Sequence, residues 1–392
     1  MSLSLLSAHG IASRAPLPLF GGHGFDRPLW HKVGPDFWGR YKRTCLDRLA
    51  DASALSTATR TALGATLSGG NQRIGGCLGP DGKIYALPYD TTDVLVVDPI
   101  GGTAATPSWG AGLSGTGKWH GTVLGPDGKI YGIPFSAPDM LIVDPEAETA
   151  TRTAMGAELS AAGKWYGAVL GPDGKIYGVP WNATDILVID PVAGTATRDD
   201  MGANLSGTAK WNGGCLGPDG KIYGIPFNSA DILIIDPVGG SATRSAMGAD
   251  LAGTVKWFGG VVAANGKIYG IPRSSSDILI IDTAAGTAAR SAMGADLSGA
   301  TKWTSGCLGP DGRIYGAPRD AADILIIDTV AGTATRSAMG ADLSGTAKWN
   351  GAVLGPDGRI YCLPLAASDF LIIGGGQSAP LPDLLSGWLN KL

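Results

Sequence analysis

The sequence contains little charge and no long hydrophobic run. Asp, Glu, Lys and Arg make up 16% of the 392 residues, against roughly 25% in an average soluble protein. No stretch approaches the ~18 consecutive apolar residues that a membrane-spanning helix needs, so we expect no insertion into a membrane. The net charge of −4 provides no basic surface for nucleic acid, so we expect no nucleic acid among the partners.

Cysteine and histidine are also scarce, with five and four residues. The cysteines are too few and too scattered for a disulfide framework. Cys77, Cys215 and Cys307 stand at a position where other copies of a repeat have valine, so they are predicted to be small buried hydrophobic residues. The histidines lack the spacing of metal ligands and no nucleotide-binding loop occurs, so we expect neither a metal nor a cofactor.

Glycine is the residue in excess, with 62 residues, and it belongs to a tandem repeat of 46 residues. A Gly-Lys/Arg-Ile-Tyr segment recurs seven times at this constant spacing, from Tyr85 to Tyr361. A proline follows each tyrosine by three residues, and an aspartate follows each proline by five. Six Lys-Trp pairs keep the same phase, from Trp119 to Trp349, and Arg73 stands at the position of the tryptophan in the first copy. Seven copies without insertion or deletion predict a repeat architecture.

Each copy has the pattern of four short strands. In the copy around Tyr223 we expect strands over 211–216, 221–226, 232–235 and 241–247, separated by turns rich in Gly, Pro, Asp and Asn. Punctuation of this kind about every eight to twelve residues excludes helical repeats. Four strands in about 45 residues are typical of one blade of a β-propeller.

The two ends of the array predict that the ring is closed. The last copy stops at Ile373 without a fourth strand, whereas 56–63, ahead of the first copy, matches the missing strand. We therefore predict an all-β protein, a seven-bladed β-propeller of four-stranded blades over 56–374, whose N-terminal strand completes the last blade. Closure removes the open sheet edges that favour aggregation.

Two segments of the blade recur with small variations, Asp-Gly-Lys-Ile-Tyr and Ile-Ile-Asp-Pro. With them the blade resembles the quinoprotein and kelch-like class of β-propeller repeat, and the resemblance covers 56–374. Similar blades occur in propeller lectins and in propeller modules of phage tail and virion proteins. The resemblance implies the fold and leaves the function open, because propellers have many unrelated activities.

Residues that recur in every copy are predicted to serve the fold. The aspartates from Asp93 to Asp369 are expected to cap the turn between the second and third strands. The tryptophans are expected to wedge between neighbouring blades, with stacking on sugar rings as the alternative. The lysine before each tryptophan is expected to form an exposed pair with a carboxylate, worth under about 1 kcal/mol.

Two positions of the repeat vary, and we expect them to carry function. One follows the proline of the second strand, the other follows the Lys-Trp pair, and both are predicted at the same end of the channel. The candidate binding face comprises Tyr89, Phe135, Trp181, Phe227, Arg273 and Arg319 at the first position, with His120, Tyr166, Asn212 and Phe258 at the second. Exposed aromatic side chains beside Asn and Arg suit a carbohydrate or a protein surface, and the arginines suit an acidic sugar or a carboxylate. The alternative to a binding role is that these positions vary through unconstrained sequence drift at exposed loop tips.

The terminal segments differ from the repeats. We predict 1–55 as an N-terminal anchoring segment with a short helix, and 375–392 as a glycine linker followed by an apolar helix. Neither segment can bury its apolar residues alone, so we expect both to attach the propeller to other protein subunits. The predicted anchoring residues are Trp30, Phe37, Trp38, Tyr41, Leu385, Trp388 and Leu389.

From the sequence we predict a binding or structural protein and no enzyme. Catalysis needs unlike groups at one point, whereas near-equal blades repeat the same group, so no catalytic residue is expected. The concrete form of this prediction is a phage tail or virion component that contacts a host receptor or surface glycan. A free multivalent carbohydrate-binding lectin and an intracellular protein-interaction scaffold are the alternatives. The expected location is accordingly a virion, or otherwise the cytoplasm.

Overall fold

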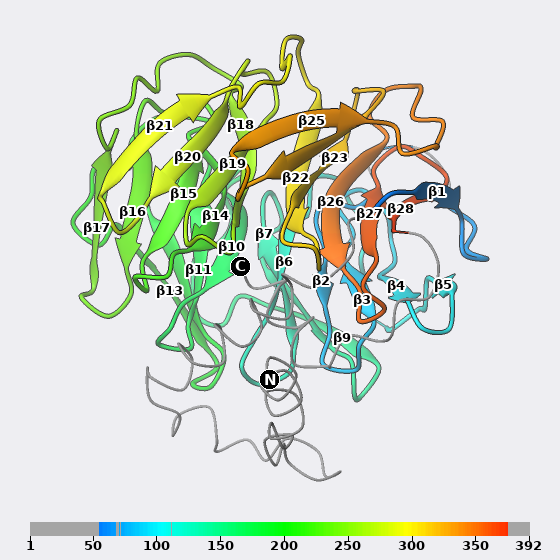
Figure 1. Cartoon of the computed structure of the whole chain (residues 1–392). Helices are drawn as coiled ribbons and strands as arrows, with labels where there is room; N and C mark the ends of the chain where they lie inside the picture. Colours follow the sequence, from blue (N-terminus) through cyan, green and yellow to red (C-terminus); the bar gives the residue numbers. More distant parts are fainter. Residues whose placement is uncertain (1–54, 68–69, 71, 111, 375–392) are drawn as a thin grey trace, which may run out of the picture. The chain divides into compact units, whose positions relative to one another are not determined.

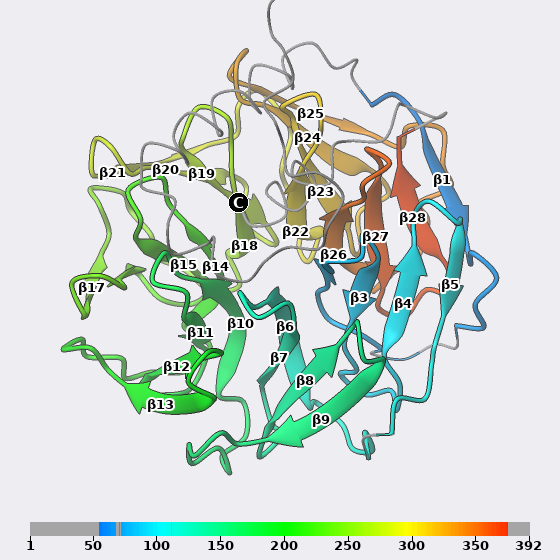
Figure 2. The ribbon, with the colours of Figure 1, turned by 90° about the horizontal axis from the view of Figure 1, so that it is seen from below.

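The described part of the chain forms a ring of seven four-stranded antiparallel sheets, which confirms the predicted all-β propeller (Figure 1, Figure 2). The computed structural model describes residues 55–67, 70, 72–110 and 112–374. All of them belong to the second of the two compact units into which the chain divides, Thr44–Leu392. The predicted anchoring residues lie outside the described residues. No described helix is long and apolar enough to cross a membrane.

Within each blade the strands follow one another outward from the channel in chain order, except that the last blade ends with β1. Blade 1 contains β2 (Cys77–Leu78), β3 (Ile84–Ala86), β4 (Leu95–Asp98) and β5 (Thr103–Ala105). Blade 2 contains β6 (Trp119–Leu124), β7 (Ile130–Pro134), β8 (Met140–Asp144) and β9 (Thr149–Thr153). Blade 3 contains β10 (Trp165–Leu170), β11 (Ile176–Pro180), β12 (Ile186–Asp190) and β13 (Thr195–Asp199). Blade 4 contains β14 (Trp211–Leu216), β15 (Ile222–Pro226), β16 (Ile232–Asp236) and β17 (Ser241–Ser245).

The remaining three blades repeat this arrangement. Blade 5 contains β18 (Trp257–Val262), β19 (Ile268–Pro272), β20 (Ile278–Asp282) and β21 (Thr287–Ser291). Blade 6 contains β22 (Trp303–Leu308), β23 (Ile314–Pro318), β24 (Ile324–Asp328) and β25 (Thr333–Ser337). Blade 7 contains β26 (Trp349–Leu354), β27 (Ile360–Pro364), β28 (Phe370–Ile373) and β1 (Ala58–Thr61).

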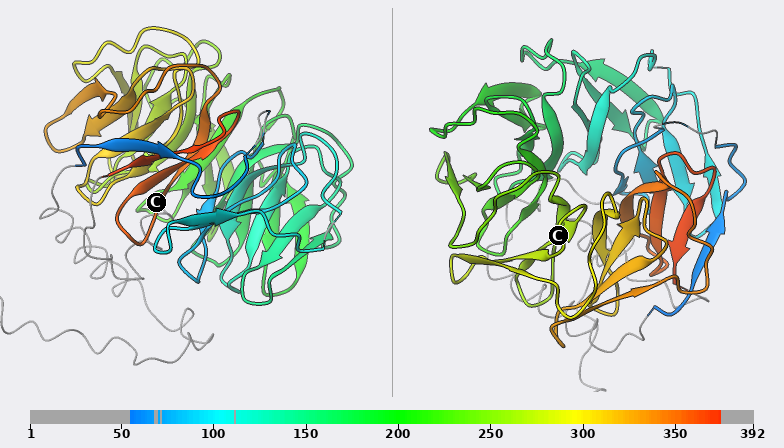
Figure 3. Two further views of the ribbon diagram at one scale, coloured as in Figure 1. Left: turned by 90° about the vertical axis from the view of Figure 1, so that its right-hand side faces the viewer. Right: turned by 90° about the horizontal axis from the view of Figure 1, so that it is seen from above.

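Blade 7 is completed from both ends of the repeat array, as predicted. β1 pairs antiparallel with β28, with Ala58 opposite Ile373 and Thr61 opposite Phe370 (Figure 3, blue beside red). The Ala58 N–H points the other way and donates to the Met339 carbonyl of blade 6 at 2.8 Å. One short strand therefore holds the outer edge of blade 7 and its junction with blade 6.

The middle strands of each blade form the core, because neighbouring blades cover both of their faces. In blade 4 every residue of β15 is buried, whereas β17 at the outer edge alternates between exposed and buried positions. Ile and Val dominate the buried strands, where β-branched side chains pack well on a pleated surface. The Tyr223 hydroxyl donates to Asp219 in the Gly-Pro-Asp-Gly turn at 2.8 Å, which ties the turn to the strand.

The tryptophans lie between blades, which confirms their predicted packing role. Trp119 of blade 2 is buried in one cluster with Tyr85, Leu87 and Val94 of blade 1. Its indole N–H donates to the Asp139 carbonyl at 2.8 Å, so its one polar atom is also satisfied. The sugar-stacking alternative for these residues is excluded by their burial.

The recurrent aspartates do not cap turns, and that prediction is wrong. Asp185 instead forms a two-point ion pair with Arg198 of β13, with nitrogen–oxygen distances of 3.1 and 2.7 Å. The Arg198 guanidinium lies 5.4 Å from the centre of the Trp165 ring and donates to the Glu158 carbonyl. The arginine lies in the fourth strand and the aspartate directly precedes the neighbouring third strand, so the pair depends on the register of these two strands.

The lysine before each tryptophan is buried, so the predicted exposed ion pair is also wrong. The Lys210 ammonium donates to the carbonyls of Trp181, Ala183 and Gly207, each at 2.9 Å. The strand begins under the loop of the preceding blade, so carbonyl oxygens rather than carboxylates surround the ammonium. Burial lowers the pKa of Lys210 to about 8. The same arrangement recurs at Lys118, Lys164, Lys256, Lys302 and Lys348, and we call these six residues the lysine clamps.

A ring of small residues brings the innermost strands together. Gly121, Gly167, Gly213 and Gly259 follow one another around the channel with φ between 65° and 81°, and Ser305 continues the ring with φ 53°. A Cβ added to Gly121 would lie 2.6 Å from the Cα of Gly167. Adjacent backbones meet here, so glycine is required both by the space and by the left-handed conformation.

Substitution in this ring is expected to have opposite effects at two equivalent positions. Gly121→Ser should lower the free energy of unfolding by about 2–3 kcal/mol, because it adds strain at positive φ and a backbone clash. Ser305→Gly should leave stability unchanged or raise it, because it relieves a positive φ and removes a buried hydroxyl without a hydrogen bond. Urea unfolding measures both, and equal midpoints for Gly121→Ser and wild type would contradict the packing argument.

Candidate functional site

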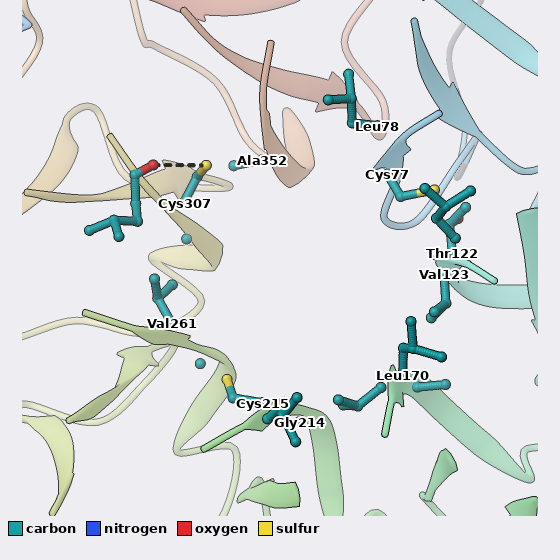
Figure 4. A pocket seen from close by; sticks show the side chains of 17 residues that line it. Cys77, Leu78, Thr122, Val123, Leu170, Gly214, Cys215, Val261, Cys307 and Ala352 are labelled. Carbon is teal, nitrogen blue, oxygen red and sulfur yellow. Dashed lines mark hydrogen bonds between the residues drawn. The ribbon is translucent and has the colours of Figure 1, made fainter. Parts of the chain in front are cut away.

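The channel itself contains a cavity of about 190 Å³ with a nearly inert lining. Figure 4 shows Val, Leu and Ala side chains around it together with Cys77, Cys215 and Cys307. Burial raises the pKa of the Cys215 and Cys307 thiols to about 12, so both remain protonated at neutral pH. Among the described residues, no three His, Cys, Asp or Glu side chains are placed to hold a metal ion.

The ten predicted binding residues gather at one end of the channel, opposite the Gly-Pro-Asp-Gly turns. We call this set the channel mouth. Each member comes either from the loop after the second strand of a blade or from the position after the tryptophan. The set comprises Tyr89, His120, Phe135, Tyr166, Trp181, Asn212, Phe227, Phe258, Arg273 and Arg319.

Backbone hydrogen bonds to the lysine clamps hold the loops of the channel mouth. The Trp181 N–H donates to the Lys164 carbonyl of its own blade at 2.8 Å, and its carbonyl accepts from the Lys210 N–H of the next blade at 3.1 Å. At the start of β10, a shift of register between Trp165 and Ala168 marks a β-bulge, which includes Tyr166. Bulges re-aim side chains.

The aromatic residues of the channel mouth form one interlocked cluster centred on Tyr166. Its ring stacks on Trp181 with centroids 4.7 Å apart and meets the edges of Phe135 and Phe258, each at 5.6 Å. Tyr166 belongs to blade 3 and Phe258 to blade 5, so this contact spans the channel. Burial raises the pKa of the Tyr166 phenol, whereas the charge of Arg273 acts to lower it.

The cluster is less exposed than the sequence predicted. Phe227 is 8% and Phe258 is 4% exposed, and Asn212 is also buried, whereas Tyr89 and Trp181 are half-buried. The loops converge toward the axis, so large side chains on them cover one another instead of extending as separate tips. The half-buried members therefore form the accessible surface, and the buried ones support it.

His120 stands in this cluster with both ring nitrogens unused. It is 5% exposed, and neither Nδ1 nor Nε2 has a hydrogen-bond partner among the described residues. Its ring contacts Tyr89, Phe135 and Tyr166. Burial lowers the pKa of His120 well below its usual range, so the imidazole is neutral at pH 7. A neutral imidazole offers one donor and one acceptor, and leaving both unpaired costs about 1–3 kcal/mol each.

Like Asn212, whose buried Nδ2 has no hydrogen-bond partner, Arg273 is a polar residue of the channel mouth with an unpartnered atom. Its guanidinium lies 4.9 Å from the ring centre of Phe258 and 5.8 Å from that of Phe227. The buried Nε makes no hydrogen bond, and no carboxylate forms an ion pair with this residue. Every other arginine in the described part of the chain has a carboxylate partner, including Arg319, which pairs with Asp320 at 2.7 Å.

Sequence reasoning assembled this group of residues but missed Asp320. The equivalent loop position in blades 3 and 4 holds Asn182 and Asn228, whose side chains accept an N–H from the next blade. Asp320 does the same for Ala347 and also pairs with Arg319. The sequence did contain a signal for this pair, because Asp320 replaces the asparagine of blades 3 and 4 directly beside Arg319. The burial of His120 had no signal in the sequence, because the direction of its side chain toward the axis depends on the closed ring.

No family model and no curated protein matches this sequence. Solved structures do match the fold. A streptogramin B lyase aligns with a TM-score of 0.63 at 16% identity, over 82% of this chain and 99% of that one. A catalytically inactive virginiamycin B lyase from Staphylococcus aureus with quinupristin aligns with a TM-score of 0.62 at 14% identity, with the same coverage. YCF48 bound to D1 peptide aligns at 0.59 and 9%, over 84% of this chain and 98% of that one. The chain shares their propeller fold.

These comparisons correct the prediction that the chain is not an enzyme. That prediction assumed that near-equal blades cannot bring unlike groups to one point, yet lyases are built on this fold. The channel mouth contradicts the assumption directly, because His120, Tyr166 and Arg273 from three blades meet there. At 16% identity or less, the similarity to these structures shows the fold alone. The similar structures include one with quinupristin and one bound to a peptide.

Proposed function

We propose that the channel mouth is a binding site for a small organic ligand with a flat apolar part and polar groups. The observation that carries this proposal is a set of buried polar atoms without hydrogen-bond partners within the aromatic cluster, namely both ring nitrogens of His120, Nδ2 of Asn212 and Nε of Arg273. Buried polar groups in folded proteins are almost always hydrogen-bonded. A ligand that enters between the rings to pair with His120 and Arg273, and that stacks on the half-buried rings of Tyr89 and Trp181, would satisfy the site.

A single axial ligand fits this site better than several equivalent sugars. A multivalent lectin needs the same binding group in each blade, whereas the seven equivalent loop positions here carry Tyr, Phe, Trp, Phe, Arg, Arg and Leu. Tyr166 also joins blades 2, 3 and 5 into one surface. Attachment to a virion or another assembly stays a prediction, because its anchoring residues lie outside the described part of the chain.

The proposal is tested with two simple probes, phenylacetamide and phenylacetate. We expect at least one of them to bind at one site per chain in isothermal titration calorimetry. Trp181→Leu should weaken this binding about tenfold, since stacking on an aromatic ring contributes about 1.4 kcal/mol. The melting temperature should change little, because Trp181 is half-buried.

Trp109→Leu is the matched control. Trp109 is also half-buried but contacts Tyr85, away from the channel mouth. It should leave probe binding unchanged. The proposal fails if neither probe binds to the wild-type protein at millimolar concentration, or if both tryptophan variants weaken binding equally.

A further inference from the structure

We propose that the ligand of the channel mouth carries a carboxylate, and that Arg273 binds it. This inference rests on the proposed function and specifies its ligand. Arg273 is the one arginine among the described residues that forms no ion pair with a carboxylate. A guanidinium presents a planar fork of donors that matches a carboxylate in two-point geometry.

The surroundings of Arg273 hold it ready for an anion. The rings of Phe227 and Phe258 lie near its guanidinium at 5.8 and 4.9 Å, and both rings are buried. Cation–π contact restricts the orientation of the side chain without using its hydrogen-bond donors. The donors that remain are therefore free for a ligand, and part of the guanidinium is already removed from water.

Asp320 acts on Arg273 through its charge but forms no ion pair with it, because its oxygens are engaged by other donors. Asp320 accepts from the Arg319 guanidinium at 2.7 Å, from the Ala347 N–H at 2.6 Å and from the Thr301 hydroxyl. Arg319 is thereby balanced, whereas Arg273 has no ion-pair partner of its own. The six lysine clamps lie under the same loops, and none has a carboxylate within ion-pair distance, so they add positive potential at this end.

Neutral groups on the other side of the axis suit the rest of the ligand. His120 offers a donor and an acceptor, and the half-buried rings of Tyr89, Phe135 and Trp181 offer apolar area. An aromatic or otherwise flat carboxylic acid therefore fits both halves, whereas a cation would meet the charge of Arg273 and a purely apolar molecule would leave the polar groups unpaired. The geometry favours a monocarboxylate, since one cation is unbalanced.

The test compares three probes of graded chemistry, phenylacetate, phenylacetamide and acetate, by calorimetry on the full chain. The wild-type protein should bind phenylacetate at least tenfold more tightly than the isosteric amide, and acetate more weakly than phenylacetate. Arg273→Gln should remove the preference for the acid, whereas binding of the amide should change less than threefold. Arg273→Lys should keep an intermediate preference, because it retains charge without the planar fork.

Arg290→Gln is the matched control, because it removes the same charge from the outer strand of the same blade, where Arg290 pairs with Asp277. It should leave the preference for phenylacetate unchanged. If the wild-type protein binds the acid and the amide equally, the proposed carboxylate preference is wrong, whereas the proposed binding site is still supported. An equal loss in both arginine variants also overturns it, since long-range charge would then explain the effect. Failure of every probe overturns the proposed function itself. Thermal unfolding of each variant confirms that it is folded.

Discussion

Proline at Thr59 and Thr61 is expected to open the ring at blade 7 and to make the protein aggregate. Both residues lie in β1, opposite Ile372 and Phe370 of β28. The Ala58 N–H points away from β28, so the alternation of a strand turns the N–H groups of Thr59 and Thr61 toward it. Proline removes those donors and is excluded from strand positions whose N–H pairs with a neighbouring strand.

Loss of β1 would expose the backbone of β28, whose four residues are all buried in the closed ring. An uncovered apolar strand edge pairs readily with other chains. The double proline variant should therefore elute as high-mass species in size-exclusion chromatography and lose its cooperative thermal transition. Thr59→Val with Thr61→Val is the control, because it keeps both N–H groups and the branched shape. If the proline variant stays monomeric and cooperative, β1 is not what closes the ring.

The blades could be predicted from the sequence because their causes are local. Turn residues fall between short apolar runs, and the expected strand over 211–216 coincides with β14. The closing strand was predictable because 56–63 continues the repeat out of order, and β1 indeed begins at Ala58. A pattern that is ambiguous in one copy becomes clear when seven copies agree. Even a short edge strand can therefore be predicted from its position within the 46-residue repeat.

The failures concern contacts that depend on how strands and blades are paired. Asp185 meets Arg198 through the register of β12 and β13, and Lys210 is enclosed by a loop of the preceding blade. The exposure of the channel mouth failed for the same reason. Phe227 and Phe258 look like loop-tip residues one blade at a time, and they become buried only when seven loops converge on one axis.

The channel mouth also shows how a symmetric ring can hold a chemically asymmetric site. Each loop has the same backbone path, because the lysine clamps and the small-residue ring are repeated. The side chain at the end of each loop is then free to differ without cost to the fold. At the loop position after the proline, blades 1 to 4 contribute aromatic rings and blades 5 and 6 contribute Arg273 and Arg319, so aromatic and cationic loops occupy different arcs of the mouth.

Lys210→Met is expected to lower the free energy of unfolding by about 2–4 kcal/mol. Methionine keeps the aliphatic stem but leaves the carbonyls of Trp181, Ala183 and Gly207 without the ammonium. Buried acceptors that lose their donor cost about 1–3 kcal/mol each, reduced here because the Trp181 carbonyl keeps its bond from the Lys210 N–H. In blade 1 Gln72 occupies this position, and its side-chain amide donates to the Ala367 carbonyl of blade 7 at 3.3 Å, so the position requires a hydrogen-bond donor to these carbonyls rather than a positive charge.

The same substitution at Lys221 separates the clamp from a general effect of lost charge. Lys221 lies in the same blade, with its side chain 44% exposed and 3.8 Å from Asp236, so Lys221→Met should change stability by less than about 0.5 kcal/mol. Urea unfolding followed by far-UV circular dichroism measures both variants. Because Lys210 holds the loop that carries Trp181, Lys210→Met should also weaken phenylacetate binding under conditions where the protein remains folded. Equal stability of the two methionine variants would mean that the buried ammonium contributes no more than a surface charge, and that the loops of the channel mouth are held by their backbone alone.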